Sequence, residues 1–351
     1  MPVSDHDLRD AWTRVLSLSG LQPGHAVTVL TGPHSHPQTL AAAVAAARGL
    51  GAGVTQILLE PVNAEKSLSR DPLAYLGVTP LTGNRVAMAA CLASDYVIDL
   101  MLLLFSPEQQ QILAAGTRIL LAVEPPEILL RLVPTEADRE RVRAAGLRLQ
   151  GARLMEVHSA AGTNIRFPLG QYPVITEYGL VDEPGRWDHW PSGFLFTWPN
   201  EGQANGTLVV DRGDILLPAK RYAVDPIQLT VRDGYVVSIE GGLEAELFRE
   251  YMESFADPEG YAMSHIGWGL QPRARWGTLG LYDREQTIAM DARAFAGNFL
   301  FSLGPNSEVG GHRHTPCHID IPLRACTVSL DGQPVVIDGV AVPQFNGGEI
   351  P

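Results

Sequence analysis

Ala26-Val-Thr-Val-Leu30 has the composition of a buried strand, and Thr39-Leu-Ala-Ala-Ala-Val-Ala-Ala-Ala-Arg48 after it consists of strong helix formers. Val54-Thr-Gln-Ile-Leu-Leu59 then returns to the composition of a strand. Strands that alternate with helices pair in parallel, because each helix carries the chain back along the sheet. This stretch therefore predicts an α/β fold built on a parallel sheet.

The same alternation continues to about residue 150. The predicted elements are a helix over Asn84–Ala93, a strand over Tyr96–Leu100, a helix around Gln109–Ala115, a strand over Arg118–Val123 and a charged connecting helix over Glu136–Leu149. No Gly-x-Gly-x-x-Gly motif follows the first strand, and Thr31-Gly-Pro-His-Ser-His-Pro37 is a poor phosphate cradle. Residues 1–150 are therefore predicted to form a Rossmann-like domain without a nucleotide site.

From about Leu154 the pattern changes to short β-rich runs between turn residues. The predicted strands are Thr207–Asp211, Gly213–Leu217, Ile227–Val231 and Tyr235–Ile239, with a hairpin turn at Asp233-Gly234 and helices over Leu243–Ser254 and Glu259–Ser264. Residues 151–351 are predicted to form an α+β domain with a mixed or antiparallel sheet.

Composition narrows the class of protein. The chain has 351 residues, 45% hydrophobic and 19% charged, and its net charge of -13 argues against a nucleic-acid-binding surface. The apolar run Leu100–Phe105 is too short to span a membrane, and the acidic start does not resemble a signal peptide. Cys91, Cys317 and Cys326 are odd in number and contain no CxxC pair, which favours a reducing, cytoplasmic location over a disulfide framework.

A candidate metal site lies near the C-terminus, at His318-x-Asp320. In the extended chain that Ile321-Pro-Leu-Arg324 predicts, residues two apart point the same way, so this imidazole and carboxylate should lie side by side. His265 is a candidate third ligand, although a lone histidine can equally be a hydrogen-bonded core residue. His312 and His314 are also two apart, but their Gly and Arg neighbours favour a solvated loop.

A second group of polar and aromatic residues lies between Glu177 and Gly193 and includes Trp187 and His189. In an irregular segment such residues suit recognition of a flat polar ring, and Glu177 and His189 are candidates for acid–base work. The alternative is a loop packed by its own tryptophans. Ser302, in a predicted strand that enters Gly304, is a possible metal or substrate contact, although most such serines bond only to the backbone.

Several segments resemble the 2,5-dihydroxypyridine 5,6-dioxygenase family, and the resemblance covers nearly the whole chain. They are Thr117–Glu127, Gly170–Pro173, Glu183–Asn200, Ser264–Arg273 and Thr315–Arg324.

This resemblance implies a mononuclear non-haem Fe(II) enzyme of nicotinate breakdown that opens 2,5-dihydroxypyridine with O2 to give N-formylmaleamate. It places the iron ligands at His265, His318 and Asp320, with Ser302 beside them. It also implies a homo-oligomer, with a hexamer as one possibility.

The chain is also similar in fold to the aminopeptidase T family. Where those peptidases carry Gly-Glu-hydrophobic-Phe, this chain has Gly193-Phe194-Leu195-Phe196; a metal-binding peptidase Glu falls at His265 and a peptidase His near Leu300. Exchanging carboxylates for an imidazole turns a two-metal hydrolytic site into a one-metal site suited to Fe(II). A metallo-aminopeptidase is therefore the second hypothesis.

One position departs from the dioxygenase pattern. The resemblance implies a His where this chain has Phe105. Phe105, Leu104 and Trp187 are candidates for the inner aromatic wall of the site. If that His moves protons, Phe105 cannot replace it, and His189 would have to. A slow enzyme, or a protein that only binds the ring, is the third hypothesis.

Overall fold

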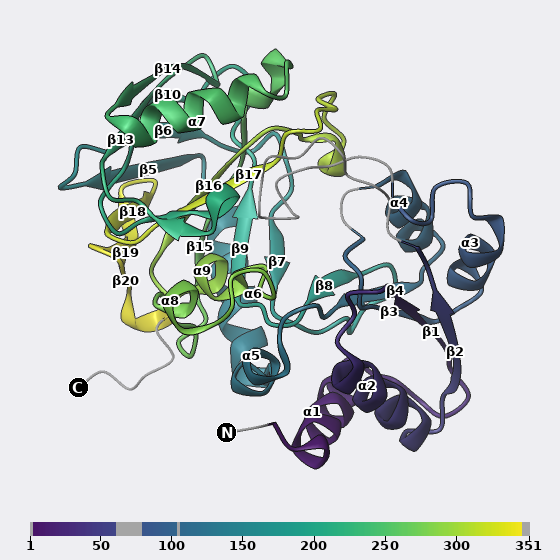
Figure 1. Ribbon diagram of the computed structural model, residues 1–351. Helices are drawn as coiled ribbons and strands as arrows, with labels where there is room; N and C mark the ends of the chain where they lie inside the picture. Colours follow the sequence, from purple (N-terminus) through teal and green to yellow (C-terminus); the bar gives the residue numbers. More distant parts are fainter. Residues whose placement is uncertain (1–2, 61–78, 104–105, 346–351) are drawn as a thin grey trace.

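The computed structural model of the chain describes residues 3–60, 79–103 and 106–345 (Figure 1). Leu104 and Phe105 therefore lie outside the described residues.

A five-stranded parallel sheet occupies one side of the molecule, in the strand order β2-β1-β3-β4-β8 (Figure 1). Its strands are β1 Ala26–Thr31, β2 Gly53–Leu58, β3 Tyr96–Asp99, β4 Arg118–Leu121 and β8 Trp187–His189. The helices of this half are α1 Asp5–Leu18, α2 Pro37–Gly49, α3 Arg85–Leu92, α4 Pro107–Ala114, α5 Pro126–Arg131 and α6 Glu136–Gln150. The predicted α/β alternation is confirmed, since each strand and helix expected before residue 150 is present within a few residues.

Strand β8 comes from a segment that the sequence suggested was irregular, and that expectation is wrong. Its residues pair in parallel with β4, where Leu120 lies opposite Asp188 and Leu121 opposite His189. The parallel sheet thus takes its last strand from beyond residue 150.

The second half is built on two antiparallel sheets. One has eight strands in the order β14-β13-β10-β6-β5-β18-β19-β20, and the other has five in the order β17-β16-β15-β9-β7. The strands of the larger sheet are β5 Leu154–Ser159, β6 Asn164–Pro168, β10 Asn205–Val210, β13 Ile227–Arg232, β14 Tyr235–Gly241, β18 Cys326–Leu330, β19 Gln333–Ile337 and β20 Val340–Ala341. Those of the smaller sheet are β7 Ile175–Glu177, β9 Phe194–Thr197, β15 Met263–Gly269, β16 Phe299–Leu303 and β17 Ile319–Leu323.

Shorter elements complete this half. They are the paired strands β11 Ile215–Leu216 and β12 Arg221–Tyr222, the helices α7 Leu243–Glu253, α8 Thr278–Leu281 and α9 Met290–Ala294, and the 3-10 turns η2 Leu217–Ala219, η3 Pro258–Tyr261, η4 Ser307–Val309 and η5 Pro343–Phe345. The predicted hairpin turn is confirmed, because Asp233 and Gly234 join β13 to β14 with φ values of 48° and 79°.

The helix predicted over Glu259–Ser264 is wrong. Only the single turn η3 forms there, and β15 begins at Met263. All residues of β15 are buried, with β9 and β16 on either side. A strand buried on both faces lacks the alternation that identifies strands in a sequence, and so its pattern can be mistaken for a helix end.

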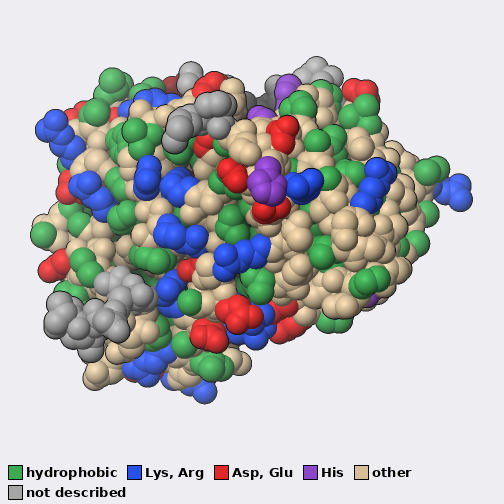
Figure 2. All heavy atoms as spheres, turned by 90° about the horizontal axis from the view of Figure 1, so that it is seen from below, with side chains coloured by type: hydrophobic (Ala, Val, Ile, Leu, Met, Phe, Trp, Pro, Cys, Tyr) green, Lys and Arg blue, Asp and Glu red, His purple; other side chains and the backbone are tan. Residues whose placement is uncertain are grey.

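The two halves share one hydrophobic core. Trp12 of α1 meets Trp190, just after β8, edge to face at 5.0 Å, and the Trp190 indole donates to the carbonyls of Leu129 and Leu132. Within the described residues no helix combines the length and the apolar character needed to cross a membrane. Seen from below, Lys and Arg side chains are interspersed with Asp and Glu (Figure 2).

Candidate metal centre

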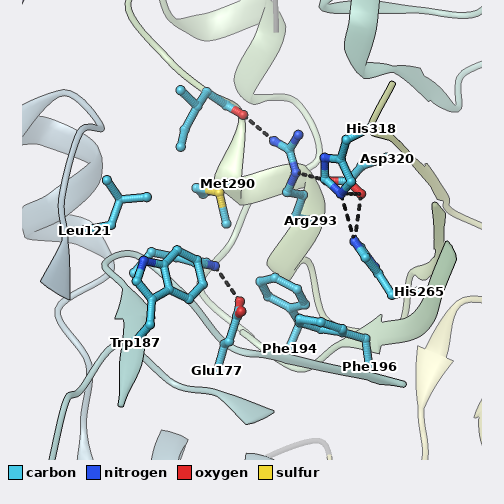
Figure 3. A pocket seen from close by; sticks show the side chains of 12 residues that line it. Leu121, Glu177, Trp187, Phe194, Phe196, His265, Met290, Arg293, His318 and Asp320 are labelled. Atoms are coloured by element: carbon cyan, nitrogen blue, oxygen red, sulfur yellow. Dashed lines mark hydrogen bonds and ion pairs between the residues drawn. The ribbon is translucent and has the colours of Figure 1, made fainter. Parts of the chain in front are cut away.

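Three side chains of the smaller antiparallel sheet converge on one point: His265 in β15, His318 directly before β17, and Asp320 in β17 (Figure 3). The His265 and His318 Nε2 atoms are 3.1 Å apart, and they lie 3.3 Å and 3.6 Å from Asp320 Oδ1. A metal with bonds of about 2.1 Å to neighbouring octahedral corners sets its ligand atoms about 3.0 Å apart. The three atoms therefore have nearly the spacing of one face of a metal octahedron.

Strand geometry explains why these residues meet. His318 and Asp320 are two apart in extended chain and so share a face, as the spacing predicts. His265 lies two strands away, where a register shift between Met263 and Ile266 interrupts the pairing of β15 with β16. Such an irregularity can re-aim a side chain, and here it accompanies the turn of His265 toward the other two residues.

Ser302 lies between them on β16, opposite Asp320 in the register. Its hydroxyl donates to the Ile319 carbonyl at 2.9 Å, so it satisfies a backbone group. The expected contact of Ser302 with metal or substrate stays a prediction.

The carboxylate of Asp320 is fixed by Arg293 of α9, whose Nε donates to Oδ2 at 2.7 Å. The other oxygen, Oδ1, is buried and has no hydrogen-bond partner among the described residues. One oxygen is thus held by the protein, while the other faces the two imidazoles. A buried acceptor in this position could be satisfied by a metal ion.

The electrostatics of these groups match their use as ligands. Burial lowers the pKa of His265 to about 3, which keeps its ring neutral. Burial alone would raise the pKa of Asp320, but the nearby Arg293 guanidinium and His318 side chain hold it below its usual range. A neutral imidazole and an ionised carboxylate are the forms that bind metals.

A cavity of about 30 Å³ adjoins the three residues (Figure 3). It is lined by the cluster residues His265, His318 and Asp320 with Arg293, and by Leu121, Glu177, Trp187, His189, Phe194, Phe196, Ile288 and Met290. The wall thus combines residues of both halves of the molecule, since Leu121, Trp187 and His189 belong to the parallel sheet.

Glu177 and His189, both expected from the sequence as polar groups of the site, form a buried pair. His189 Nε2 lies 2.6 Å from Glu177 Oε2, and His189 Nδ1 lies 2.6 Å from the carbonyl oxygen of Pro191. A carbonyl oxygen only accepts, so Nδ1 carries a proton, and Nε2 and Oε2 share one more between them. Burial raises the pKa of Glu177, and the neighbouring Glu177 raises that of His189, so both shifts favour keeping this proton.

Trp187, which was expected to contribute to the aromatic wall of the site, lines the cavity. His312 and His314 are exposed and do not belong to the cluster, as expected.

Sequence reasoning missed Arg293, Ile288 and Met290. Nothing in Ala292-Arg-Ala294 distinguishes Arg293 from a surface arginine, and only the fold shows that it is 2% exposed.

Comparisons with known proteins show which family this chain resembles over its length. A model of the family described as NicX, 2,5-dihydroxypyridine 5,6-dioxygenase, matches residues 7–343. The chain is 56% identical over 342 residues to 2,5-dihydroxypyridine 5,6-dioxygenase of Pseudomonas putida KT2440, covering 97% of this chain and 98% of that protein.

Two solved structures are similar to this chain over nearly its whole length. The structure of 2,5-dihydroxypyridine dioxygenase from Pseudomonas putida KT2440 matches with a TM-score of 0.96 and 54% identity, over 99% of this chain and 100% of that one. AmpT from Thermus thermophilus matches with a TM-score of 0.64 over 96% of this chain and 99% of that one. At 15% identity this second likeness concerns the fold alone, and it confirms the expected aminopeptidase T-like fold.

Proposed function

The chain belongs to the 2,5-dihydroxypyridine 5,6-dioxygenase family, and we propose that it opens the ring of 2,5-dihydroxypyridine with O2 at one Fe(II) ion, giving N-formylmaleamate. The expected enzyme class, a dioxygenase, is confirmed by this membership. The identity of the ion, its three protein ligands and the product of ring opening are what we propose in addition.

The observation that carries the proposal is the convergence of His265, His318 and Asp320 on one point of a buried cavity. Two imidazoles and one carboxylate on one face of an octahedron leave the opposite face for substrate and O2, which is the arrangement of non-haem Fe(II) oxygenases. When bound, Fe(II) supplies the oxygen chemistry that amino-acid side chains lack.

The rest of the cavity wall is suited to hold a flat ring away from water. Phe194 stacks on Phe196 with ring centroids 5.4 Å apart, and Phe194 also lies 5.3 Å from the ring of His189. This apolar wall orients the ring and excludes water from the reaction. A peptidase would need a second set of carboxylates, and Phe194 stands where the peptidase motif has its Glu.

The Glu177–His189 pair provides the acid–base group. The pair carries one shared proton, and once that proton has been released the pair can accept the proton of a ring hydroxyl, because both side chains line the cavity. A base that accepts the hydroxyl proton makes the ring more electron-rich and therefore easier to oxidise.

An oxygen electrode tests the proposal. With Fe(II) added anaerobically, the parent should consume O2 in proportion to added 2,5-dihydroxypyridine and should hydrolyse no peptide. His265→Ala, His318→Ala and Asp320→Ala should each lose bound iron and activity. His314→Ala, at an exposed histidine of the same region, is the matched control and should keep both.

Absence of O2 uptake by the iron-loaded parent would overturn the proposed reaction. Full iron content in all three ligand variants would overturn the ligand assignment alone.

Pathway, location and assembly belong to the same proposal. We assign the chain to nicotinate breakdown in the cytoplasm as a homo-oligomer, with a hexamer as the size to test, and with the ring compound and O2 as its substrates. Cys91, Cys317 and Cys326 are buried and free, which suits a reducing compartment. Sedimentation velocity measures the oligomer directly.

A further inference from the structure

A second, larger cavity adjoins the metal centre. Its volume is about 370 Å³, against about 30 Å³ for the inner cavity. The two share Glu177, Trp187 and Phe196 as lining residues, so these three side chains form the boundary between them. The outer cavity runs between α4, which provides Leu113, and η4, which provides Glu308 and Val309.

The sizes of the two cavities suggest different uses. The inner cavity has space for about two water molecules, less than a substituted pyridine ring needs. The outer cavity falls in the range of about 300–1,000 Å³ that is typical of ligand pockets. Side chains of the inner cavity must therefore move for a ring to bind at the metal centre, and the outer cavity lies on the other side of three of them.

The charged groups of the outer cavity are mostly acidic. Arg186 is engaged: it donates to Asp188 at 2.8 Å and lies over the Tyr178 ring at 3.9 Å. Glu183 is paired with Arg143 at 2.7 Å. Glu308 differs, because both its carboxyl oxygens are buried without a hydrogen-bond partner from another described residue.

We infer that the outer cavity is the passage by which the substrate reaches the metal centre, and that Glu308 makes this passage selective for uncharged hydroxylated N-heterocycles over ring carboxylates. The inference rests on the proposed function and deepens it. Burial raises the pKa of Glu308, while the nearby His318 and Arg313 act to lower it. In its ionised form Glu308 repels a carboxylate on an incoming ring, while a neutral ring of the same size is unaffected.

Binding without O2 tests the selectivity. Calorimetry on the anaerobic iron-loaded protein compares a neutral hydroxypyridine with a hydroxypyridine carboxylate. The parent should bind the neutral ring roughly tenfold more tightly or better. Glu308→Gln should narrow this ratio at least threefold by strengthening binding of the anion, and Glu140→Gln, at an exposed glutamate of α6, should leave it unchanged.

Bulky substitutions test the passage. Leu113→Trp and Val309→Trp, from opposite walls, should slow association of the neutral ring about tenfold with unchanged iron content. Val86→Trp, at a residue that is 81% exposed, is the control. Nitric oxide binding to the iron is a second measurement that shows whether each variant retains an intact centre.

Parent-like association rates in both bulky variants, or an unchanged ratio in Glu308→Gln, would overturn the inference. If the parent still turns over 2,5-dihydroxypyridine, these results overturn only the passage and its selectivity, and the proposed dioxygenase function stands. If the parent consumes no O2, the proposed dioxygenase function itself is overturned.

Discussion

At the scale of single residues, Arg293 determines how Asp320 can act. Its guanidinium occupies Oδ2 and is itself anchored to the Ile288 carbonyl, so only Oδ1 is directed at the imidazoles. Asp320 is thereby prepared to bind a metal through one oxygen. Partners of this kind around a metal site usually influence its affinity strongly.

Replacing Arg293 should weaken metal binding without removing a ligand. We expect Arg293→Gln to lower iron affinity about 10- to 100-fold, because the Asp320 carboxylate loses its fixed orientation. Equilibrium dialysis against buffered Fe(II) measures this affinity. Arg148→Gln, at an exposed arginine of α6, is the matched control, and equal affinity in both variants would contradict the role of Arg293.

Glu177 should affect turnover and leave metal binding intact. Glu177→Gln keeps the shape of the side chain but cannot exchange the proton shared with His189. We expect kcat to fall about 10²- to 10⁴-fold, the usual contribution of a general acid–base group. Steady-state O2 uptake gives kcat, and the iron content shows whether metal binding is intact. A kcat within threefold of the parent would rule out an acid–base role for Glu177.

The sequence predicted these residues unevenly. The alternation of an extended chain indicated His318 and Asp320. His265 was a candidate third ligand that a lone histidine could not establish by itself, and the resemblance to the dioxygenase family favoured it. Arg293 carried no such signal, because its partner Asp320 lies 27 positions away and their contact depends on how α9 packs against β17.

At the scale of elements, β15 depends on two close backbone approaches. A Cβ on Gly267 would lie 1.9 Å from the Leu195 carbonyl oxygen, and one on Gly269 would lie 2.2 Å from that of Phe295. Both glycines let neighbouring segments approach the strand that carries His265.

Gly267→Ala should therefore separate β15 from β9 and disturb the metal centre. We expect a loss of about 3 kcal/mol or more in the free energy of unfolding, together with weaker iron binding. Gly277→Ala is the matched control, because no atom lies within 4 Å of its added Cβ. Urea unfolding of both variants measures the difference, and equal midpoints would contradict the steric argument.

Glu124 connects the end of β4 to the segment before α9. Its carboxyl oxygens accept from the Thr287 hydroxyl at 2.6 Å and the Met290 amide at 2.8 Å. Burial raises the pKa of Glu124 from 4.5 to about 7. The folded protein thus keeps a proton that the unfolded chain releases above about pH 4.5.

This difference in proton binding sets the direction in which stability changes with pH. The contribution of Glu124 to stability is complete below pH 4.5 and is lost as the pH rises to about 7, by up to about 3 kcal/mol. Glu124→Gln does not titrate, so its free energy of unfolding relative to the parent should rise between pH 4.5 and 7. A constant difference across this range, measured by urea unfolding, would contradict the assignment.

The elements of the parallel half could be predicted because local signals define them: alanine-rich helices and short apolar strands. The antiparallel half was harder. Its pairing joins distant segments, as in β5 with β18, and buried strands such as β15 have no alternating pattern.

At the scale of the whole molecule, the metal centre lies where the two halves meet. Leu121 and His189 come from the parallel sheet, whereas His265 and Asp320 come from the smaller antiparallel sheet. The predicted division at residue 150 does not separate the two halves completely, since β8 from beyond it pairs with β4 of the parallel sheet.

Separate fragments 1–150 and 151–351 should not fold alone. The first loses β8 from the edge of its sheet, and the second exposes Trp190, which is 1% exposed in the whole chain. Circular dichroism and amide exchange on each fragment, beside the full chain, test this. A cooperative unfolding transition in either fragment would contradict it.

The spacing of the three ligand atoms has a practical consequence. A preformed face of two imidazoles and one carboxylate accepts most divalent transition metals, and copper, nickel and zinc generally bind such donors more tightly than ferrous iron. With Fe(II) as the proposed native ion, mismetallation is therefore the expected fate of this protein when it is isolated in air or on a nickel column. The activity of a preparation will follow its history of metal exposure, and stripping with chelator before anaerobic reconstitution should restore it.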